Sequence, residues 1–372
     1  MKDKLPDLVI KDLIINPPII QGGMGVRVSA SSLASSVSNE GALGVIAAVG
    51  LGEEWPDKKI DYKTRSELAF RQMIRETRKL TKNPFGVNIM YVLSNYDDLV
   101  RVAEQEGVDA IISGAGLPLK LPSLVKNNGV KLIPIVSSGR AADLICKSWI
   151  RRYNRLPDAL ILEGPLAGGH LGFTFEDLDN IENFSLEKLL TEALAVTKGY
   201  ERLSKTKIPV IAAGGIFNGK DIARILKLGA SGIQMATRFV CTYECDAALA
   251  YKEVFLNSKK EDIIVIQSPV KMPGRVIKNK FVERILKGEK IHFDCPYKCL
   301  KTCEPEEVSY CIARALVNAY RGNLDEGFVM CGANAYRVKK IISVKELIEE
   351  LVDEAVKEFY RTRDKDEAIK VK

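Results

Sequence analysis

One histidine stands in a part of the sequence that is rich in glycine. His170 belongs to residues 167–172 (AGGHLG), whereas the other histidine of the chain, His292, has no glycine beside it. An imidazole has an unperturbed pKa near 6.5, which suits proton transfer at neutral pH. An isolated histidine is more often structural, but glycines on both sides let the backbone approach a ligand closely. His170 is therefore the candidate catalytic residue.

Three further groups of small residues follow apolar segments. They lie at 21–25 (QGGMG), 212–216 (AAGGI) and 234–238 (QMATR). A tight turn between a strand and a helix also needs such residues, so each group alone is compatible with a purely structural role. Together they provide candidate binding residues: Gly22, Gly23, Met24, Gly214, Gly215, Gln234, Met235, Ala236 and Thr237.

The elements that position these residues follow a regular alternation between residues 17 and 258. Expected strands cover 18–21, 43–47, 85–90, 110–113, 131–136, 159–163, 209–213 and 232–236, and expected helices include 65–80, 95–106, 139–152, 186–203 and 219–228. Continuous apolar strands that alternate with helices predict a parallel sheet. Eight such units in about 240 residues favour a (β/α)8 TIM barrel, and an open doubly wound sheet is the alternative. The predicted fold class is thus α/β, with a barrel domain over 15–258.

In such a barrel, the groups of small residues predict a phosphate site. The loops after the seventh and eighth strands commonly bind phosphate through backbone N–H groups. Gly214, Gly215 and Ala236 allow a close approach there, and Thr237 adds a hydroxyl donor. The chain has neither a complete G-x-x-x-x-G-K-[ST] motif nor a G-x-G-x-x-G motif that opens a first helix, which disfavours a nucleotide bound as in a Rossmann fold. A phosphorylated cofactor across the barrel mouth is expected, and FMN is the commonest one.

The region 259–372 departs from this alternation and is interpreted as a C-terminal extension packed on the barrel. It contains residues 268–277 (SPVKMPGRVI), a segment with several cysteines, and an amphipathic helix expected over 344–361. Residues 362–372 are expected to form a frayed tail. The helix is expected to pack on the barrel or on a second subunit, which leaves a homodimer open.

Four cysteines recur within 295–311 (CPYKCLKTCEPEEVSYC). Their spacing differs from the C-x2-C steps of iron–sulfur proteins and lies at the edge of the range seen in zinc sites. The preferred interpretation is a compact loop with small buried thiols and no metal. If a metal does bind, Cys295, Cys299, Cys303 and Cys311 are the candidate ligands.

Composition excludes several classes of protein. The 55 Lys and Arg residues exceed the 48 Asp and Glu residues by only 7, without a basic run, so no nucleic-acid surface is expected. No apolar stretch is long enough to span a membrane. The first residues (MKDKLP) are charged and do not resemble a signal peptide, which favours the cytoplasm, where disulfides are rare.

The ordered motifs resemble those of the nitronate monooxygenase family, formerly called 2-nitropropane dioxygenases. This family also contains the FMN-dependent enoyl-acyl-carrier-protein reductase II. The resemblance covers residues 15 to about 280 and rests on 18–25 (PIIQGGMG), 86–90 (GVNIM), 167–172, 211–216 (IAAGGI), 234–239 (QMATRF) and 268–277. Ala236 stands where the family more often has glycine.

The resemblance implies a barrel that holds FMN without a covalent bond. Main-chain atoms of Gly22, Gly23 and Met24 would lie along the isoalloxazine ring. The amide of Asn88 would contact the flavin or its ribityl chain, and Glu163 occupies a position where the family has a polar side chain, often Gln. Gly168 would allow a close backbone approach, while Gly215 and residues 234–237 would bind the phosphate.

The resemblance also implies an activity on a small molecule. The first expectation is a flavoprotein monooxygenase that oxidises alkyl nitronates with O2 to a carbonyl compound and nitrite, with His170 acting near the nitro group. The alternative is an NAD(P)H-dependent enoyl-acyl-carrier-protein reductase II, in which His170 positions or protonates an enoyl thioester. A second alternative is an FMN-binding barrel with another redox substrate or none. None of these needs a metal, a nucleic acid or a membrane.

Overall fold

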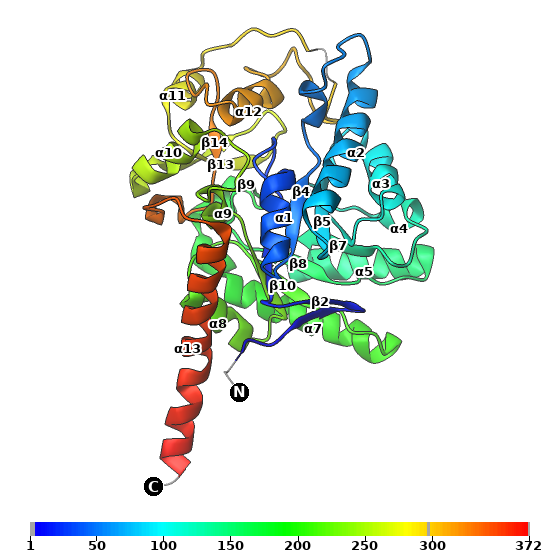
Figure 1. Cartoon of the computed structure of the whole chain (residues 1–372), viewed down its shortest axis with the longest axis vertical. Coiled ribbons are helices and arrows are strands. Elements are labelled where there is room, and N and C mark those ends of the chain that lie inside the picture. Colours follow the sequence, from blue (N-terminus) through cyan, green and yellow to red (C-terminus); the bar gives the residue numbers. More distant parts are fainter. Residues whose placement is uncertain (1–3, 296–297, 371–372) are drawn as a thin grey trace.

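The structure is a computed structural model that describes residues 4–295 and 298–370. Its centre is a barrel of parallel strands, which in chain order are β3 Ile19–Gln21, β4 Gly44–Ala47, β5 Phe85–Met90, β6 Ala110–Gly114, β7 Lys131–Val136, β8 Leu160–Glu163, β10 Val210–Ala213 and β11 Gly232–Met235 (Figure 1). β11 pairs with β3, and the amide of Gln21 donates to the carbonyl of Leu43 beside β4 at 2.9 Å, which closes the ring. The predicted α/β barrel is confirmed, and the open sheet is excluded.

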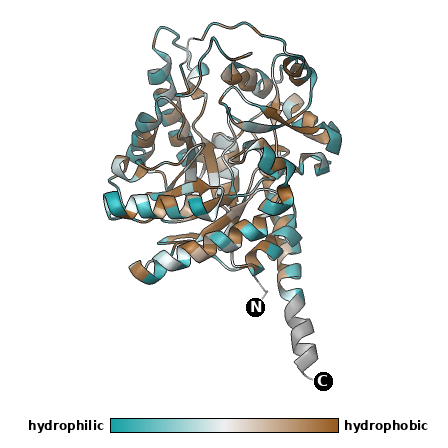
Figure 2. Ribbon diagram, turned by 180° about the vertical axis from the view of Figure 1, so that it is seen from behind, coloured by the Kyte–Doolittle hydropathy of each residue, from teal (hydrophilic) through white to brown (hydrophobic). Residues whose placement is uncertain are grey.

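Burial on both sides explains the apolar strands. Every residue of β4, β6, β10 and β11 is buried. Helices cover the outside: α1 Ser31–Asn39, α2 Tyr62–Leu80, α3 Tyr96–Gln105, α4 Leu121–Leu124, α5 Gly139–Tyr153, α7 Leu186–Ser204, α8 Gly219–Lys227 and α9 Thr237–Val240. Figure 2 shows hydrophobic residues gathered in the central strands and hydrophilic ones on the outward faces of the helices. The connection at residues 50–63 contains the short helix η1 Leu51–Glu53.

A hairpin at the start of the chain was not predicted from the sequence. Its strands are β1 Leu8–Ile10 and β2 Leu13–Ile15. Leu8 and Ile15 are buried in one cluster with Val45, Ile133 and Ile211 of the barrel strands. The hairpin therefore closes the N-terminal end of the barrel. Strands of three residues are too short to show a hydrophobic period.

The extension covers the opposite end of the barrel. After α10 Leu249–Asn257, which ends the barrel region, the extension comprises η3 Lys260–Asp262, β12 Ile263–Gln267, β13 Pro273–Ile277, α11 Lys280–Leu286, α12 Ile312–Tyr320, β14 Val329–Met330, η4 Ala335–Arg337 and α13 Val344–Lys370. β13 pairs with β12 and β14, and also with β9 Gly169–His170 from the long connection after β8. That connection also holds α6 Phe175–Asp179 and η2 Ile181–Phe184. A strand of the extension thus lies directly against the histidine-containing loop of the barrel.

The terminal helix α13 packs along α8 and then projects beyond the body of the molecule (Figure 1). The expectation of a frayed tail from residue 362 is wrong, because the helix continues to Lys370. Residues 362–370 (TRDKDEAIK) include several good helix formers that continue an existing helix, and lengthening a helix requires no new nucleus. Among the described residues, no helix combines the length and the apolar composition needed to cross a membrane.

Candidate functional site

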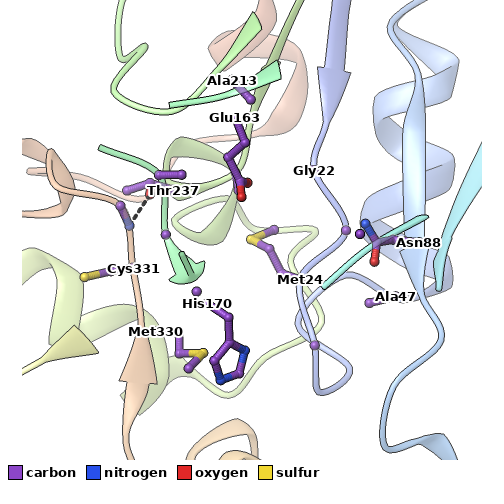
Figure 3. A pocket seen from close by; sticks show the side chains of 18 of the residues that line it. Gly22, Met24, Ala47, Asn88, Glu163, His170, Ala213, Thr237, Met330 and Cys331 are labelled. Atoms are coloured by element: carbon purple, nitrogen blue, oxygen red, sulfur yellow. Dashed lines mark hydrogen bonds between the residues drawn. The ribbon is translucent and has the colours of Figure 1, made fainter. Parts of the chain in front are cut away.

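A cavity of about 270 Å³ opens at the C-terminal ends of the barrel strands, where this fold places its active sites (Figure 3). The structure brings all of the residues singled out in the sequence to its wall: Gly22, Gly23, Met24, Asn88, Glu163, Gly168, His170, Gly214, Gly215, Gln234, Met235, Ala236 and Thr237. Their place is therefore established, while their individual roles remain predictions. Cys331 of the extension lines the same cavity.

Glycine is required at several of these positions for different reasons. Gly214 and Gly215 have φ angles of 94° and 83°, a region that favours glycine. At Gly23, an added Cβ would lie 2.5 Å from the Cβ of Asn88. The chain therefore passes close to the cavity without side chains that would fill it.

His170 is held by the strand that carries it and by a neighbouring hydroxyl group. It pairs with Gly274 of β13. Its Nε2 lies 2.8 Å from the hydroxyl of Ser268, which is only 3% exposed. Burial lowers the pKa of His170 to about 4, so the imidazole is neutral at physiological pH. Its side chain lies beside Met330 of β14 (Figure 3).

Glu163 is the last residue of β8, and its carboxyl group points into the cavity (Figure 3). Burial raises the pKa of this carboxyl group to about 7, because the charged form loses its hydration. Asn88 from β5 faces the same space from another wall. The cavity thus contains an acid that is partly protonated at neutral pH.

A buried arginine fixes the loop that leads to His170. Arg275 of β13 is 6% exposed, and its Nη1 donates to the carbonyl of Pro165 at 2.8 Å and also to that of Ala167. Burial lowers the pKa of this guanidinium group. Sequence reasoning missed both Arg275 and Ser268, although both lie in the 268–277 segment that it had noted. The basic residue in an otherwise apolar strand was the available signal.

The predicted phosphate end of the cavity includes a third segment that sequence reasoning also missed. The amide of Gly332 donates to the hydroxyl of Thr237 at 3.1 Å, and the side-chain amide of Asn334 donates to the carbonyl of Gly215 at 2.8 Å. Gly168 packs so closely against this segment that an added Cβ would lie 2.6 Å from the carbonyl carbon of Cys331. The small residues of 331–334 (CGAN) after β14 were the signal.

The chemistry of the wall fits a flavin. The Oε1 atom of Gln234 is buried and has no hydrogen-bond partner in the described structure, so it is ready to accept from a ring N–H or a ribityl hydroxyl group. Glycines and apolar side chains elsewhere allow a flat ring to pack against the wall. The backbone N–H groups of the loops with Gly215 and Thr237 are the predicted donors to the phosphate, and binding through them needs no cation.

The candidate metal ligands lie in another part of the extension, within residues 295–311. All eight cysteines are free thiols. Within the described ranges, no three His, Cys, Asp or Glu side chains already surround a common metal position.

Comparisons with known proteins were consistent with this arrangement. A family model described as nitronate monooxygenase matches residues 7–354. A probable nitronate monooxygenase of Staphylococcus aureus is 28% identical over 74% of this chain and 79% of its own length. A hydroxy-methyl-oxo-octahydro-indene-carboxyl-CoA dehydrogenase of Mycobacterium tuberculosis is 30% identical over 74% of this chain and 67% of its own length.

Solved structures of related proteins are also similar to this chain. The structure of FabK from Thermotoga maritima is 31% identical and has a TM-score of 0.72, with 95% of this chain and 96% of that chain covered. A nitroalkane oxidase from Streptomyces ansochromogenes has a TM-score of 0.71 at 21% identity, over 94% of this chain and 98% of that chain, which shows a shared fold.

Proposed function

Because the chain belongs to the nitronate monooxygenase family of flavin-dependent oxidoreductases, we propose that it binds FMN and reduces an enoyl thioester. The choice of an enoyl thioester over a nitronate rests on one observation. Among the described residues, the wall of the cavity contains no lysine and no arginine. A substrate whose reacting group is uncharged is therefore favoured over one whose reacting group is an anion.

The states of two ionisable groups at the site, His170 and Glu163, also favour an uncharged reacting group. His170 is neutral at physiological pH, and Glu163 becomes negative as the pH rises through about 7. A nitronate anion would find no positive partner beside either group, and burial of an unpaired charge is unfavourable. Apolar side chains such as Phe255, Val270 and Leu316 line the wall and suit an acyl chain.

Two relatives support this choice. FabK is the enoyl-acyl-carrier-protein reductase II, and the mycobacterial dehydrogenase is named for a CoA thioester. Both are at least 30% identical to this chain, against 28% for the staphylococcal proteins. The identities differ little, and the cavity wall is the main support for this choice of substrate.

In this proposal, different residues of the cavity wall have different roles. Bound FMN would supply hydride transfer, with NAD(P)H as the source of electrons. Gln234 and Glu163 would hydrogen-bond the flavin. The hydroxyl of Ser268 engages Nε2 of His170, which leaves Nδ1 for the thioester carbonyl oxygen. A neutral imidazole that donates from Nδ1 polarises this carbonyl group.

Nitronate chemistry is the second candidate, and the state of His170 supports it. An imidazole can act as a base only when it is unprotonated, and burial keeps His170 in that form at physiological pH. His170 would then abstract a proton from an uncharged nitroalkane that has entered the cavity. This version avoids the need for a charged substrate to enter from water.

An anaerobic spectroscopic titration separates the two candidates. The flavin band of the purified protein should bleach on addition of NADH or NADPH and return on addition of crotonyl-CoA. Release of nitrite from propyl nitronate in air, without bleaching by either nucleotide, would contradict the reductase proposal and support the second candidate. A protein that contains no flavin and does not take up FMN would contradict both.

A further inference from the structure

Four thiols of the extension form a cluster outside the chemistry proposed above. They belong to Cys295, Cys299, Cys303 and Cys311. Besides burial, the other three cysteines raise the pKa of Cys299, and Cys295 and Cys311 also raise the pKa of Cys303, which indicates that the four side chains lie near one another. None of them is in a disulfide. Neither the barrel nor the flavin chemistry requires this group of side chains.

The backbone around the thiols is held at several points. The amide of Ile291 donates to the carbonyl of Ser309 at 2.7 Å, which closes the segment into a loop. The carbonyl of Cys299 accepts from the amide of Ser94 at 3.0 Å, and the amide of Lys301 donates to the carbonyl of Val92 at 2.9 Å. The loop is therefore tied to the connection that follows β5.

The last of the four cysteines begins a helix. Cys311 is the N-cap residue of α12, and its carbonyl accepts from the amide of Ala315 at 3.0 Å. Cys299 and Cys303 pack against the main hydrophobic core. Burial raises the pKa of Cys299 to about 12 and also raises the pKa of Cys303 and of Cys311.

The combination of four convergent thiols, anchored backbone and absent disulfides is typical of a ligand set for soft metals. We propose that Cys295, Cys299, Cys303 and Cys311 bind a thiophilic metal centre as thiolates, either one zinc ion or an iron–sulfur cluster. A metal replaces the four protons, and its positive charge stabilises thiolates that burial alone would destabilise.

The spacing of the thiols bears on the kind of metal. In the described structure, no three of them surround one metal position. Four sulfurs around a single zinc ion lie close together, because each Zn–S bond is about 2.3 Å long. A zinc ion would therefore draw the loop inward, whereas a cluster of several irons spans a wider set of thiolates.

The cluster also adjoins the flavin cavity. Cys299, Leu300 and Ile312 are part of the cavity wall. Loading of the metal would thus fix one part of the cavity wall, although the metal site itself does not depend on the proposed substrate. Failure of the reductase assay would leave the metal proposal intact.

The test is metal analysis of the full-length protein, purified with its flavin and without oxygen or chelators. We expect about one zinc per chain, or about four irons with about four acid-labile sulfides. A zinc protein would have only the flavin spectrum, whereas a cluster would add a broad charge-transfer absorption that dithionite bleaches. Substoichiometric metal of every kind, below about one tenth per chain, would overturn the proposal.

Variants locate the site. Cys295→Ser and Cys303→Ser, neither of which lines the flavin cavity, should each lower the bound metal about tenfold or more, with flavin content unchanged. Cys146→Ser is the matched control, because Cys146 is a buried thiol in α5, outside the extension, and its substitution should leave the metal content unchanged. Equal metal content in all three variants would contradict the assignment of the ligands.

A second measurement covers the case in which the variants do not fold. In the native wild-type protein, a strong chelator should increase the number of thiols that react with an alkylating reagent by about four. Peptide mapping should place the new adducts on the four cysteines. Identical labelling with and without the chelator, or recovery of these cysteines as disulfides, would overturn the proposal.

Discussion

At His170, the position of the backbone and the orientation of the ring are set by two different neighbours. Pairing of β9 with β13 fixes the backbone, and the hydroxyl of Ser268 engages Nε2 at 2.8 Å. In the proposed function, this hydrogen bond determines which ring nitrogen faces the substrate. A change in the pKa of the ring would not by itself determine this. Ser268 is thus a positioning residue that acts through His170.

Substitution of Ser268 tests this role. Ser268→Ala should lower kcat about tenfold while KM changes little, because a lost hydrogen bond of about 1 to 1.5 kcal/mol would be missing from the oriented imidazole. Ser268→Thr, which keeps the hydroxyl group, should restore most of the rate. The measurement is steady-state turnover of the enoyl thioester with NAD(P)H. Ser123→Ala, at an exposed serine, is the control and should have no effect.

Glu163 should give the flavin-free protein a distinctive dependence of stability on pH. Its folded-state pKa, about 7, lies above the ordinary value of 4.5, so the folded state retains a proton that the unfolded state releases. The free energy of unfolding should therefore fall as the pH rises from about 4.5 to about 7, by on the order of 2 to 3 kcal/mol. Glu163→Gln should remove this slope and be more stable than the wild type at pH 8. Denaturant titrations at pH 5 and pH 8 measure both effects, and equal slopes for the two proteins would refute the assignment.

Which site residues could be predicted depended on where they lie in the chain. Gly22, Gly215 and Thr237 follow barrel strands directly, so strand order alone brings them to one edge. Ser268 contacts a residue 98 positions away, and Arg275 contacts carbonyl groups more than 100 positions away. No local spacing encodes such pairings, which depend on the register between β9 and β13.

Among the secondary-structure elements, the contact between the loop after β8 and the segment after β14 is the tightest part of the site. Gly168→Ala would place a methyl group 2.6 Å from the carbonyl carbon of Cys331, so the two segments would have to separate. We expect a loss of about 1 to 3 kcal/mol in stability and weaker flavin retention. Thermal unfolding and flavin content after gel filtration measure these effects.

The matched control for this substitution is a glycine in open surroundings. Gly199 lies in α7, and an added Cβ there would meet no atom within 4 Å. Gly199→Ala should therefore be neutral or stabilise the helix by about 0.5 to 1 kcal/mol, with flavin retained. A similar loss of flavin in both variants would show that the contact at Gly168 has no special role.

The elements themselves were largely predictable. β5 and β7 have the predicted bounds, and the other barrel strands differ by one residue at an end. Buried parallel strands give long apolar runs, which are a strong signal. β1, β2 and β9 were missed because strands of two or three residues are stabilised by tertiary pairing, which local sequence does not reveal.

Across the whole molecule, α13 connects the end of the chain to the loops that are predicted to bind phosphate. It packs on α8 so closely that a Cβ at Gly219 would lie 2.4 Å from the amide nitrogen of Ala355. The carboxylate of Glu354 accepts from the amide of Gly219, and that of Glu350 from the guanidinium group of Arg238. α13 therefore braces the helices that follow β10 and β11.

Removal of a buried side chain from α13 tests this brace. Leu351 is fully buried, and Leu351→Ala should destabilise the protein by about 2 to 5 kcal/mol through the cavity it leaves. Flavin affinity should fall as well, because the loops at Gly215 and Thr237 lose support. Leu203, which is 83% exposed in α7, provides the control, and Leu203→Ala should change the stability by less than about 0.5 kcal/mol. Equal effects of the two substitutions in chemical denaturation would argue against the brace.

The pairing of β9 with β13 also has a consequence for biosynthesis. All eight barrel strands precede residue 236, but the strand that aligns His170 begins at Pro273, and the segment that contacts Thr237 follows at Gly332. During vectorial synthesis the ribosome releases the complete barrel sequence before either of these segments. The wall of the cavity can therefore be completed only after the barrel strands have been synthesised, and a chain interrupted after the barrel would lack the strand that aligns its histidine.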